Sequence, residues 1–227
     1  MEAIVTRQVE LTNAIMGHAK EATPYDQLKA AIADVHPPTA EHSIRVRICA
    51  TSIGLTWGLS GRELTNLAIA AEIHDIGKLY VPIAILDKPG PLTDKEWAVI
   101  KKHPGWGAEL LEGVFPGQPE IAFCVGHHHE RLDGSGYPGK LREHQLPVLC
   151  RILAVADAYA SLTEDRSYRA AFGSRDAMGV LRYVEEGKYD KNVLDALASV
   201  QISLHSERSF RFNPNTNFTF IRTLISV

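Results

Sequence analysis

The sequence has no apolar run approaching the roughly 18 residues that span a bilayer, and it does not open with a signal peptide. Its three cysteines are odd in number and widely spaced in apolar segments, which excludes a disulfide framework and indicates a reducing compartment. The net charge of -3 gives no reason to expect a nucleic acid polymer as partner, so any phosphate recognition must be local. These absences predict a globular, cytoplasmic protein with no membrane association.

The 227 residues do carry repeated helix signals. A cap and proline at Thr23-Pro24 start one helix, and Thr39 is expected to cap the next. Capping boxes open at Ser60 and at Thr93. Pro147 precedes a helix that is apolar almost all round, which predicts a central, buried position. The chain therefore reads mainly as helices packed around one sizeable core.

Three consecutive histidines, His127, His128 and His129, stand where an apolar helix ends and a loop rich in glycine begins. The loop runs to Pro138. Successive residues on a regular helix point about 100° apart, so adjacent histidines can share one target only near a helix end. The flanking carboxylates favour a metal or catalytic role over surface or core histidines.

Two aspartates occur in predicted helices that are otherwise apolar. Asp75 follows His74 at the end of one such helix, and Asp157 is the only acid in the middle of another. A buried ionised carboxylate is costly unless it is paired or coordinates a cation. A salt bridge from Asp75, for instance to Lys78, is the structural alternative to a metal site.

Two further histidines complete a set of nitrogen and oxygen ligands. His42 lies in the first turn of a predicted helix, and His103 lies at the end of another. The set exceeds the needs of one metal and suits two, with one carboxylate bridging. No thiolate is placed to join it, and imidazole-rich ligation argues against a dedicated magnesium or calcium cage, so iron, manganese and zinc remain open. The candidate ligands are His42, His74, Asp75, His103, His128, His129 and Asp157.

An ordered series of motifs resembles the HD-GYP family of bacterial cyclic dinucleotide phosphodiesterases, within the HD metal-dependent phosphohydrolase superfamily. The resemblance covers most of the chain, from about residue 39 to 197. It rests on His42-Ser43 with Arg45-Val46, His74-Asp75-Ile76-Gly77-Lys78, Leu86-Asp87-Lys88-Pro89-Gly90-Pro91-Leu92-Thr93, His128-His129-Glu130, Asp133-Gly134-Ser135-Gly136-Tyr137-Pro138, and Asp157 with Arg166, Tyr168 and Arg169.

The resemblance implies an all-α fold, a compact multi-helix HD-domain bundle around a buried metal centre, usually of iron or manganese. One metal would take His42, His74, Asp75 and Asp157, and the second would take Asp75, His103, His128 and His129. His127 falls outside the family pattern and is interpreted as structural. Members with a third metal carry a glutamate four residues before the first ligand histidine, where this chain has Pro38, so two ions are predicted.

The resemblance also assigns substrate contacts. Asp75 and Lys78 are the expected catalytic residues, and Lys78 would lie near the scissile phosphate. Tyr137 would shape the loop around the substrate together with Gly136 and Pro138. The phosphate oxygens would be held by Arg166 and Arg169.

The predicted function is hydrolysis of cyclic di-GMP to linear pGpG by a hydroxide shared between the two metals, with further cleavage to GMP left open. Cyclic GMP-AMP is the alternative substrate, and a non-catalytic module that binds cyclic dinucleotides is the alternative class. The intact ligand set and complete glycine-tyrosine-proline loop favour the enzyme.

Three segments are predicted: helices at 1–36 acting as linker or dimerisation element, an HD-GYP catalytic domain at 37–202, and a tail at 203–227. The tail alternates aromatic and polar residues around a turn, which suggests a small β-hairpin. The opening residues are too few for a receiver or sensor domain, so a homodimer and a regulatory protein partner are both left open.

Overall fold

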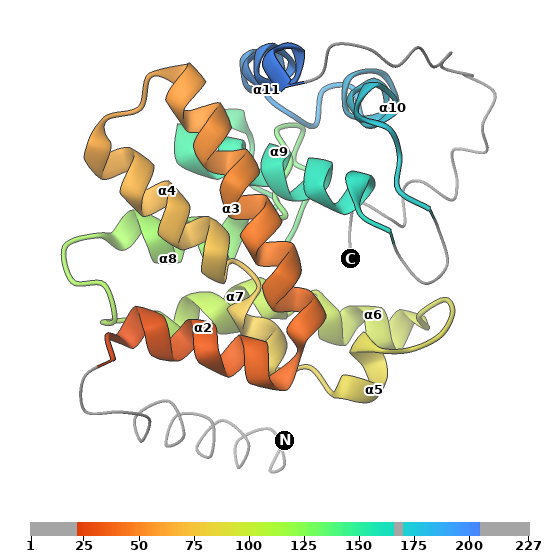
Figure 1. Cartoon of the computed structure of the whole chain (residues 1–227). Coiled ribbons are helices and arrows are strands. Elements are labelled where there is room, and N and C mark those ends of the chain that lie inside the picture. Colours follow the sequence, from red (N-terminus) through yellow and green to blue (C-terminus); the bar gives the residue numbers. More distant parts are fainter. Residues whose placement is uncertain (1–21, 166–169, 205–227) are drawn as a thin grey trace.

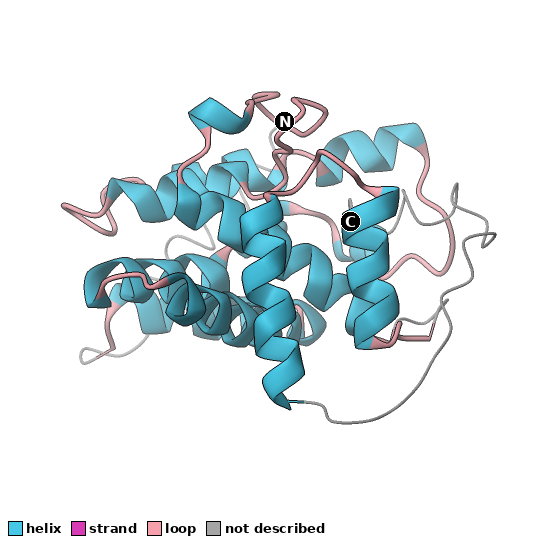
Figure 2. Ribbon diagram, turned by 90° about the horizontal axis from the view of Figure 1, so that it is seen from above, coloured by secondary structure: helices cyan, strands magenta, loops and turns pink. Residues whose placement is uncertain are grey.

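A computed structural model of the chain describes residues 22–165 and 170–204. This part of the chain is helical, and its one strand-like pairing is an isolated antiparallel bridge between Asp133 and Arg142. The predicted all-α fold is therefore confirmed, as Figure 2 shows. The predicted hairpin in the tail lies outside the described residues. No helix in the described ranges is long and apolar enough to cross a membrane.

The helices keep the labels of Figure 1. In chain order they are α2 Pro24–Val35, α3 Pro37–Trp57, α4 Gly61–Ile73, the 3-10 helix η1 Ile76–Tyr80, α5 Ile83–Leu86, α6 Asp94–Ile100, α7 His103–Leu110, α8 Pro119–His127, the 3-10 helix η2 Glu143–Gln145, α9 Val148–Thr163, α10 Ser174–Gly179, the π-helical turn η3 Val180–Val184 and α11 Lys191–Leu204.

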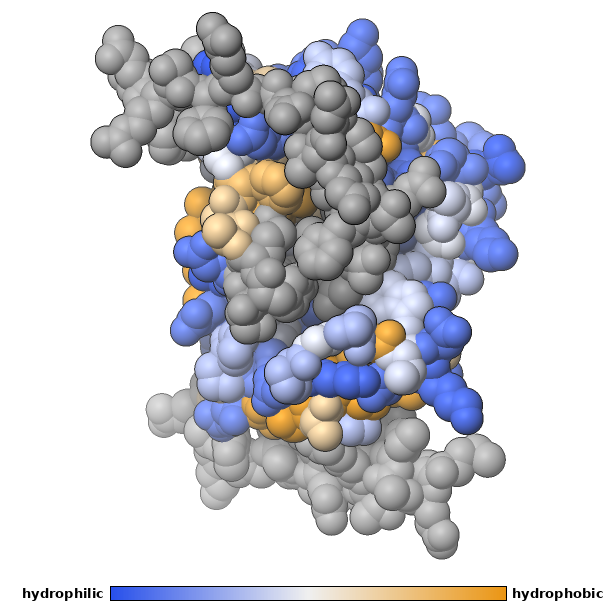
Figure 3. Space-filling view, turned by 90° about the vertical axis from the view of Figure 1, so that its right-hand side faces the viewer, coloured by the Kyte–Doolittle hydropathy of each residue, from blue (hydrophilic) through white to orange (hydrophobic). Residues whose placement is uncertain are grey.

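Helix α9 is the centre of the bundle, as its all-round apolar sequence predicts. Thirteen of its sixteen residues are buried. The long helix α3 lies across it and also packs on α4 and α11 (Figure 1). Charged and polar side chains cover most of the described surface in Figure 3, with smaller hydrophobic areas between them.

Local capping explains where several helices begin. Both predicted capping boxes form, at Ser60 for α4 and at Thr93 for α6. The prediction that Thr39 caps α3 is wrong. His36 is the cap, and its Nδ1 accepts from the Thr39 backbone N–H at 3.2 Å. Two prolines follow His36, and proline is well suited to the first helical turn, so α3 begins three residues earlier than expected.

Helix α2 shares the core of the following helices. Its Leu28 and Ile32 are buried in the main hydrophobic cluster, which also contains Ile76 of η1, and α2 contacts α3, α4 and η1. Part of the segment predicted as a linker or dimerisation element thus packs against the predicted catalytic domain. The segment boundaries themselves stay a prediction.

Candidate metal centre

The close approach of η1 to α7 brings Asp75 beside His103. A Cβ atom on Gly77 would lie 1.9 Å from the His103 carbonyl oxygen and 2.6 Å from the Gly107 nitrogen. Only glycine permits backbones to approach this closely. Helix α4 ends at Ile73 and η1 begins at Ile76, so His74 and Asp75 form the turn between them. Both side chains are buried.

A second close approach fixes the loop after α8. A Cβ atom on Gly136 would lie 2.4 Å from the Glu130 Cα and 2.5 Å from the His129 carbonyl oxygen. The buried Glu130 carboxylate accepts backbone N–H bonds from Gly139 and from Leu141 at 2.5 and 3.0 Å. The glycine-rich loop is thereby held against the end of α8, next to the histidines.

Tyr137 of that loop contacts the last of the three histidines. Its ring stacks on His129 with 4.8 Å between centroids and 25° between planes, and the Trp97 ring meets Tyr137 edge-on at 6.5 Å. The peptide bond from Tyr137 to Pro138 is cis. Burial raises the pKa of the Tyr137 hydroxyl well above its usual value, so this hydroxyl is neutral.

Asp75 lies between two groups of imidazoles. Its Oδ2 is 3.2 Å from His74 Nε2, while its Oδ1 is 3.2 Å from His103 Nε2 and 3.9 Å from His128 Nε2. The two histidine nitrogens on the Oδ1 side are themselves 3.2 Å apart. The two oxygens of one carboxylate thus face different sets of nitrogens, as expected for a carboxylate that bridges two cations.

Asp157 closes the other side of the cluster from the centre of α9. Its Oδ1 is 3.0 Å from His42 Nε2 and 3.7 Å from His74 Nε2, and its Oδ2 is 3.9 Å from His129 Nδ1. Helices α3, α7 and α9 and the residues that follow α4 and α8 therefore all contribute to one buried site. The seven candidate ligands are brought together, and none is more than 8% exposed.

The ligand atoms form sets that could each hold one cation, with all members within 4.8 Å of one another. One set coincides with the ligands expected for the second metal: Asp75, His103, His128 and His129. Another contains three of the four ligands expected for the first: His42, His74 and Asp75. A third joins Asp157 to both: His74, His128 and Asp157.

Four buried polar atoms of the cluster lack a hydrogen-bond partner among the described residues. They are His74 Nε2, Asp75 Oδ1 and both ring nitrogens of His129. Each such buried atom costs about 1–3 kcal/mol if it is left unsatisfied. Imidazole nitrogens and carboxylate oxygens aimed at a common centre fit divalent transition metals, and binding would satisfy these atoms.

The carboxylates in this cluster are ionised. Burial acts to raise the pKa of Asp75, but His74, Lys78 and the nearby imidazole of His103 hold it well below the usual range. Burial also opposes ionisation of Asp157, whose pKa is likewise held low, first by its hydrogen bond with His42. The centre of the site therefore holds two ionised carboxylates.

Most of the imidazoles are neutral. Burial lowers the pKa of His103, His128 and His129, and neighbouring imidazoles depress the last two further. His42 differs, because hydrogen bonds to Asp157 and Glu164 overcome its burial and raise its pKa. Metal ions bind ionised carboxylates and neutral imidazoles, so this protonation pattern is suited to them.

Lys78 pairs with Asp75 from the first turn after it. Lys78 Nζ donates to Asp75 Oδ2 at 2.9 Å, and its side chain is 12% exposed. The salt bridge considered as the structural alternative is thus present, but Asp75 also faces three imidazoles. An ion pair alone leaves Asp75 Oδ1 without a partner among the described residues.

Some predicted residues lie elsewhere. His127 points away from the ligand sets, since its Nδ1 donates to the Phe123 carbonyl at 2.8 Å and its ring stacks on Phe123. Arg166 and Arg169 lie outside the described residues. Glu164 had no predicted role, yet it contacts His42. The one signal for it is an acid directly after the apolar helix that carries Asp157.

Comparison with known proteins gives a consistent result. The HD domain family model matches residues 26–193. A 3'3'-cGAMP-specific phosphodiesterase 1 of Vibrio cholerae is 32% identical over 80% of this chain and 46% of its own length. The cyclic di-GMP phosphodiesterase response regulator RpfG of Xanthomonas campestris is 40% identical over 62% of this chain and 37% of its own length.

The chain thus spans less than half the length of these curated relatives. Among solved structures, the HDG"Y"P protein Bd1817 from Bdellovibrio bacteriovorus shares the fold, with a TM-score of 0.59 and 19% identity over 88% of this chain and 64% of that one. Because the family model covers well over half of the sequence, and the relatives at 28–40% identity are of the HD-GYP type, this chain belongs to the HD domain family and to its HD-GYP type.

Proposed function

We propose that the protein is a metal-dependent phosphodiesterase that hydrolyses a cyclic dinucleotide. The observation that carries this proposal is the buried convergence of two ionised carboxylates and five imidazoles, with four of their polar atoms unsatisfied among the described residues. The substrate class comes from relatives named for cyclic di-GMP and for 3'3'-cGAMP.

Two divalent ions, iron or manganese, would occupy the site. His42, His74, Asp75 and Asp157 would hold one, and Asp75, His103, His128 and His129 the other. When bound, such a pair supplies Lewis-acid activation of water and neutralises charge on the phosphate. Pro38 offers no ligand atom for a third ion, which supports a binuclear centre.

Among the described residues, Lys78 is placed to act on the phosphodiester. Its ammonium group already lies at the rim of the cluster, 2.9 Å from Asp75 Oδ2. There it would orient a phosphate oxygen or give a proton to the departing sugar oxygen. The ring of Tyr137, which stacks on His129, would help to shape the loop around the substrate together with Gly136 and Pro138.

Arg166 and Arg169 are proposed from sequence as the phosphate clamp. They follow directly on α9, whose end carries Glu164 close to the cluster. Guanidinium groups bind phosphate oxygens in a bidentate manner. The two arginines would therefore hold one phosphodiester of the cyclic dinucleotide while its second phosphodiester enters the metal site.

Cyclic di-GMP is the first candidate substrate, with a linear dinucleotide as product. The second is 3'3'-cGAMP, because the relative that aligns over 80% of this chain is named for it. The two differ in one base, so discrimination must come from groups that contact the base edge.

The test is turnover of both cyclic dinucleotides by protein loaded anaerobically with ferrous iron or with manganese. Asp75→Ala should abolish linear product, while Asp34→Ala, which alters an exposed aspartate on α2, should leave it unchanged. If the loaded protein binds either dinucleotide but never cleaves it, the phosphodiesterase proposal fails and a binding module takes its place.

A further inference from the structure

Three of the cluster histidines are oriented in the same way. Each donates its Nδ1 proton to the carbonyl three residues earlier, which lies in the last turn of a helix. Such carbonyls have no partner inside the helix and are free to accept. The pairs are His74 with Ala71 at 2.9 Å, His103 with Ile100 at 2.7 Å and His128 with Val125 at 2.7 Å.

His42 cannot use this device. It lies within α3, where the carbonyls serve the hydrogen bonds of the helix itself. Its Nδ1 instead faces Glu164 Oε2 at 3.0 Å, while its Nε2 faces Asp157 Oδ1 at 3.0 Å. The carboxylate of Glu164 thus replaces the helix carbonyl, and it leaves Nε2 as the atom presented to the cluster.

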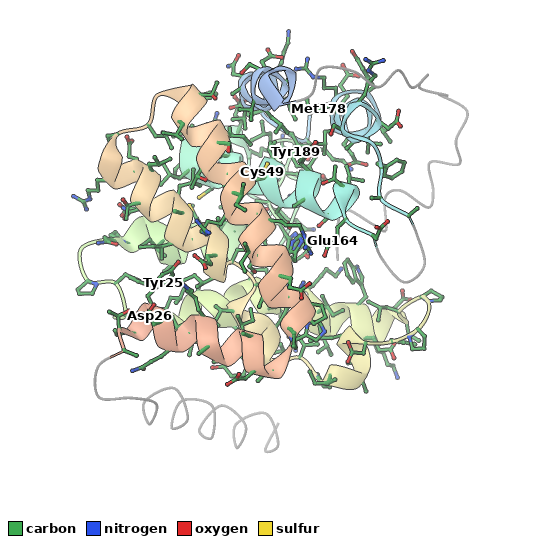
Figure 4. All side chains as sticks on the ribbon, viewed as in Figure 1. Tyr25, Asp26, Cys49, Glu164, Met178 and Tyr189 are labelled. Carbon is green, nitrogen blue, oxygen red and sulfur yellow. The ribbon has the colours of Figure 1, made fainter. Side chains whose placement is uncertain are left out.

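Glu164 is itself held in place. Arg45, one turn after His42 on the same face of α3, forms an ion pair with Glu164 Oε1. Glu164, which is labelled in Figure 4, directly follows α9. Its carboxylate connects the end of α9 to α3 through His42 and Arg45. Its side chain is 20% exposed, in contrast to the buried ligands themselves.

We propose that Glu164 is a positioning residue for one of the two metal ions. It fixes which nitrogen of His42 carries the proton and which nitrogen binds metal, and Arg45 holds Glu164 for this task. A partner of this kind raises ligand basicity and typically changes metal affinity by about 10- to 100-fold. This inference rests on the proposed metal function and concerns only the ion bound by His42.

The alternative is that the ion pair between Arg45 and Glu164 merely clamps two helix ends. The two roles predict different behaviour toward metal. A clamp would affect stability and both ions alike, whereas an orienting partner of His42 would weaken one ion selectively. Glutamine at position 164 could still accept from Nδ1, so it should preserve orientation while losing the charge.

The experiment is calorimetric titration of metal-free protein with Mn²⁺, without substrate. Glu164→Ala should weaken one of the two ions by about 10- to 100-fold and leave the other unchanged. Glu164→Gln should weaken the same ion less. Asp195→Asn breaks an arginine–carboxylate pair far along the chain, between Arg182 and Asp195, and should leave both affinities unaltered.

The His42→Ala background supplies the second arm. If Glu164 acts through His42, adding Glu164→Ala to His42→Ala should cause no further loss of affinity. An additional loss in that background, an equal weakening of both ions, or no change in Glu164→Ala would overturn the inference while leaving the metal centre standing. Wild-type protein that binds no Mn²⁺ would overturn both this inference and the proposed function.

Discussion

Gly77→Ala tests whether the close approach of η1 and α7 builds the site. The added Cβ would lie 1.9 Å from the His103 carbonyl oxygen, and Cβ atoms do not approach such neighbours closer than 3.0 Å. The two backbones must then separate by about 1.1 Å. If that shift fell entirely on the contact between Asp75 Oδ1 and His103 Nε2, now 3.2 Å, the two atoms would lie about 4.3 Å apart.

The expected cost is that of overpacking a tight interior, about 1–3 kcal/mol of unfolding free energy. For a domain of this size that corresponds to a fall of about 2–12 °C in Tm. A displacement of about 1 Å at a catalytic site can cost about 100-fold in rate, so turnover should fall further than stability suggests.

Gly105→Ala is the matched control, because it lies in α7 between His103 and Gly107 and its added Cβ meets nothing within 4 Å. Alanine is favoured over glycine in a helix by up to about 1 kcal/mol, so this variant should be as stable as wild type or more so. Differential scanning calorimetry and turnover should be measured on both. Gly77→Ala protein with wild-type Tm, metal content and turnover would refute the reasoning.

Three further perturbations test separately the role of the glycine-rich loop, the protonation of the histidines and the binding of metal. Gly136→Ala would place a Cβ 2.4 Å from the Glu130 Cα, so the loop should shift and KM for the cyclic dinucleotide should rise several-fold in steady-state assays. Metal-free protein should lose stability as pH falls below about 6.5, since His128 and His129 have lowered pKa values in the fold and the unfolded chain binds more protons there. The pKa of His103 is lowered as well, so the raised pKa of His42, which acts in the opposite direction, is one group against three. Calorimetry at pH 7 and pH 5 measures the sum. Mn²⁺ at 100 times its Kd should stabilise the fold by about 2.7 kcal/mol for each site that it fills, and a chelator should reverse the gain.

Much of the fold could be predicted from sequence because its signals are local. The capping boxes at Ser60 and Thr93 depend on side chains three residues apart, and both form as predicted. The burial of α9 follows from its composition alone. The cap of α3 was predicted wrongly, because a histidine at position 36 is a less familiar cap than Thr39 and accepts through a ring nitrogen.

The sequence could predict which residues are candidate ligands, but it could not predict which of their atoms face one another. Asp75 and Asp157 stand out because a carboxylate in an apolar helix needs a partner. Which oxygen faces which imidazole depends on how η1 meets α7, and that contact is set by the absence of a side chain at Gly77. Sequence motifs mark such a glycine without saying what lies against it.

Glu164 could not be assigned from sequence for a different reason. Its role depends on His42, which is 122 positions away, and on the lack of a free carbonyl inside α3. The local sequence around Glu164 is equally compatible with an ordinary helix end that has no role at a metal site. Only the tertiary structure places its carboxylate against Nδ1 of that histidine.

The most direct measurement of the central claim is the number of metal ions bound per chain, by elemental analysis of protein loaded anaerobically and freed of excess metal. We predict two ions of iron or manganese per chain in active protein, and fewer in Asp75→Ala, which removes the carboxylate shared by both ligand sets. Three ions in the wild type, or full turnover with none bound, would contradict the account.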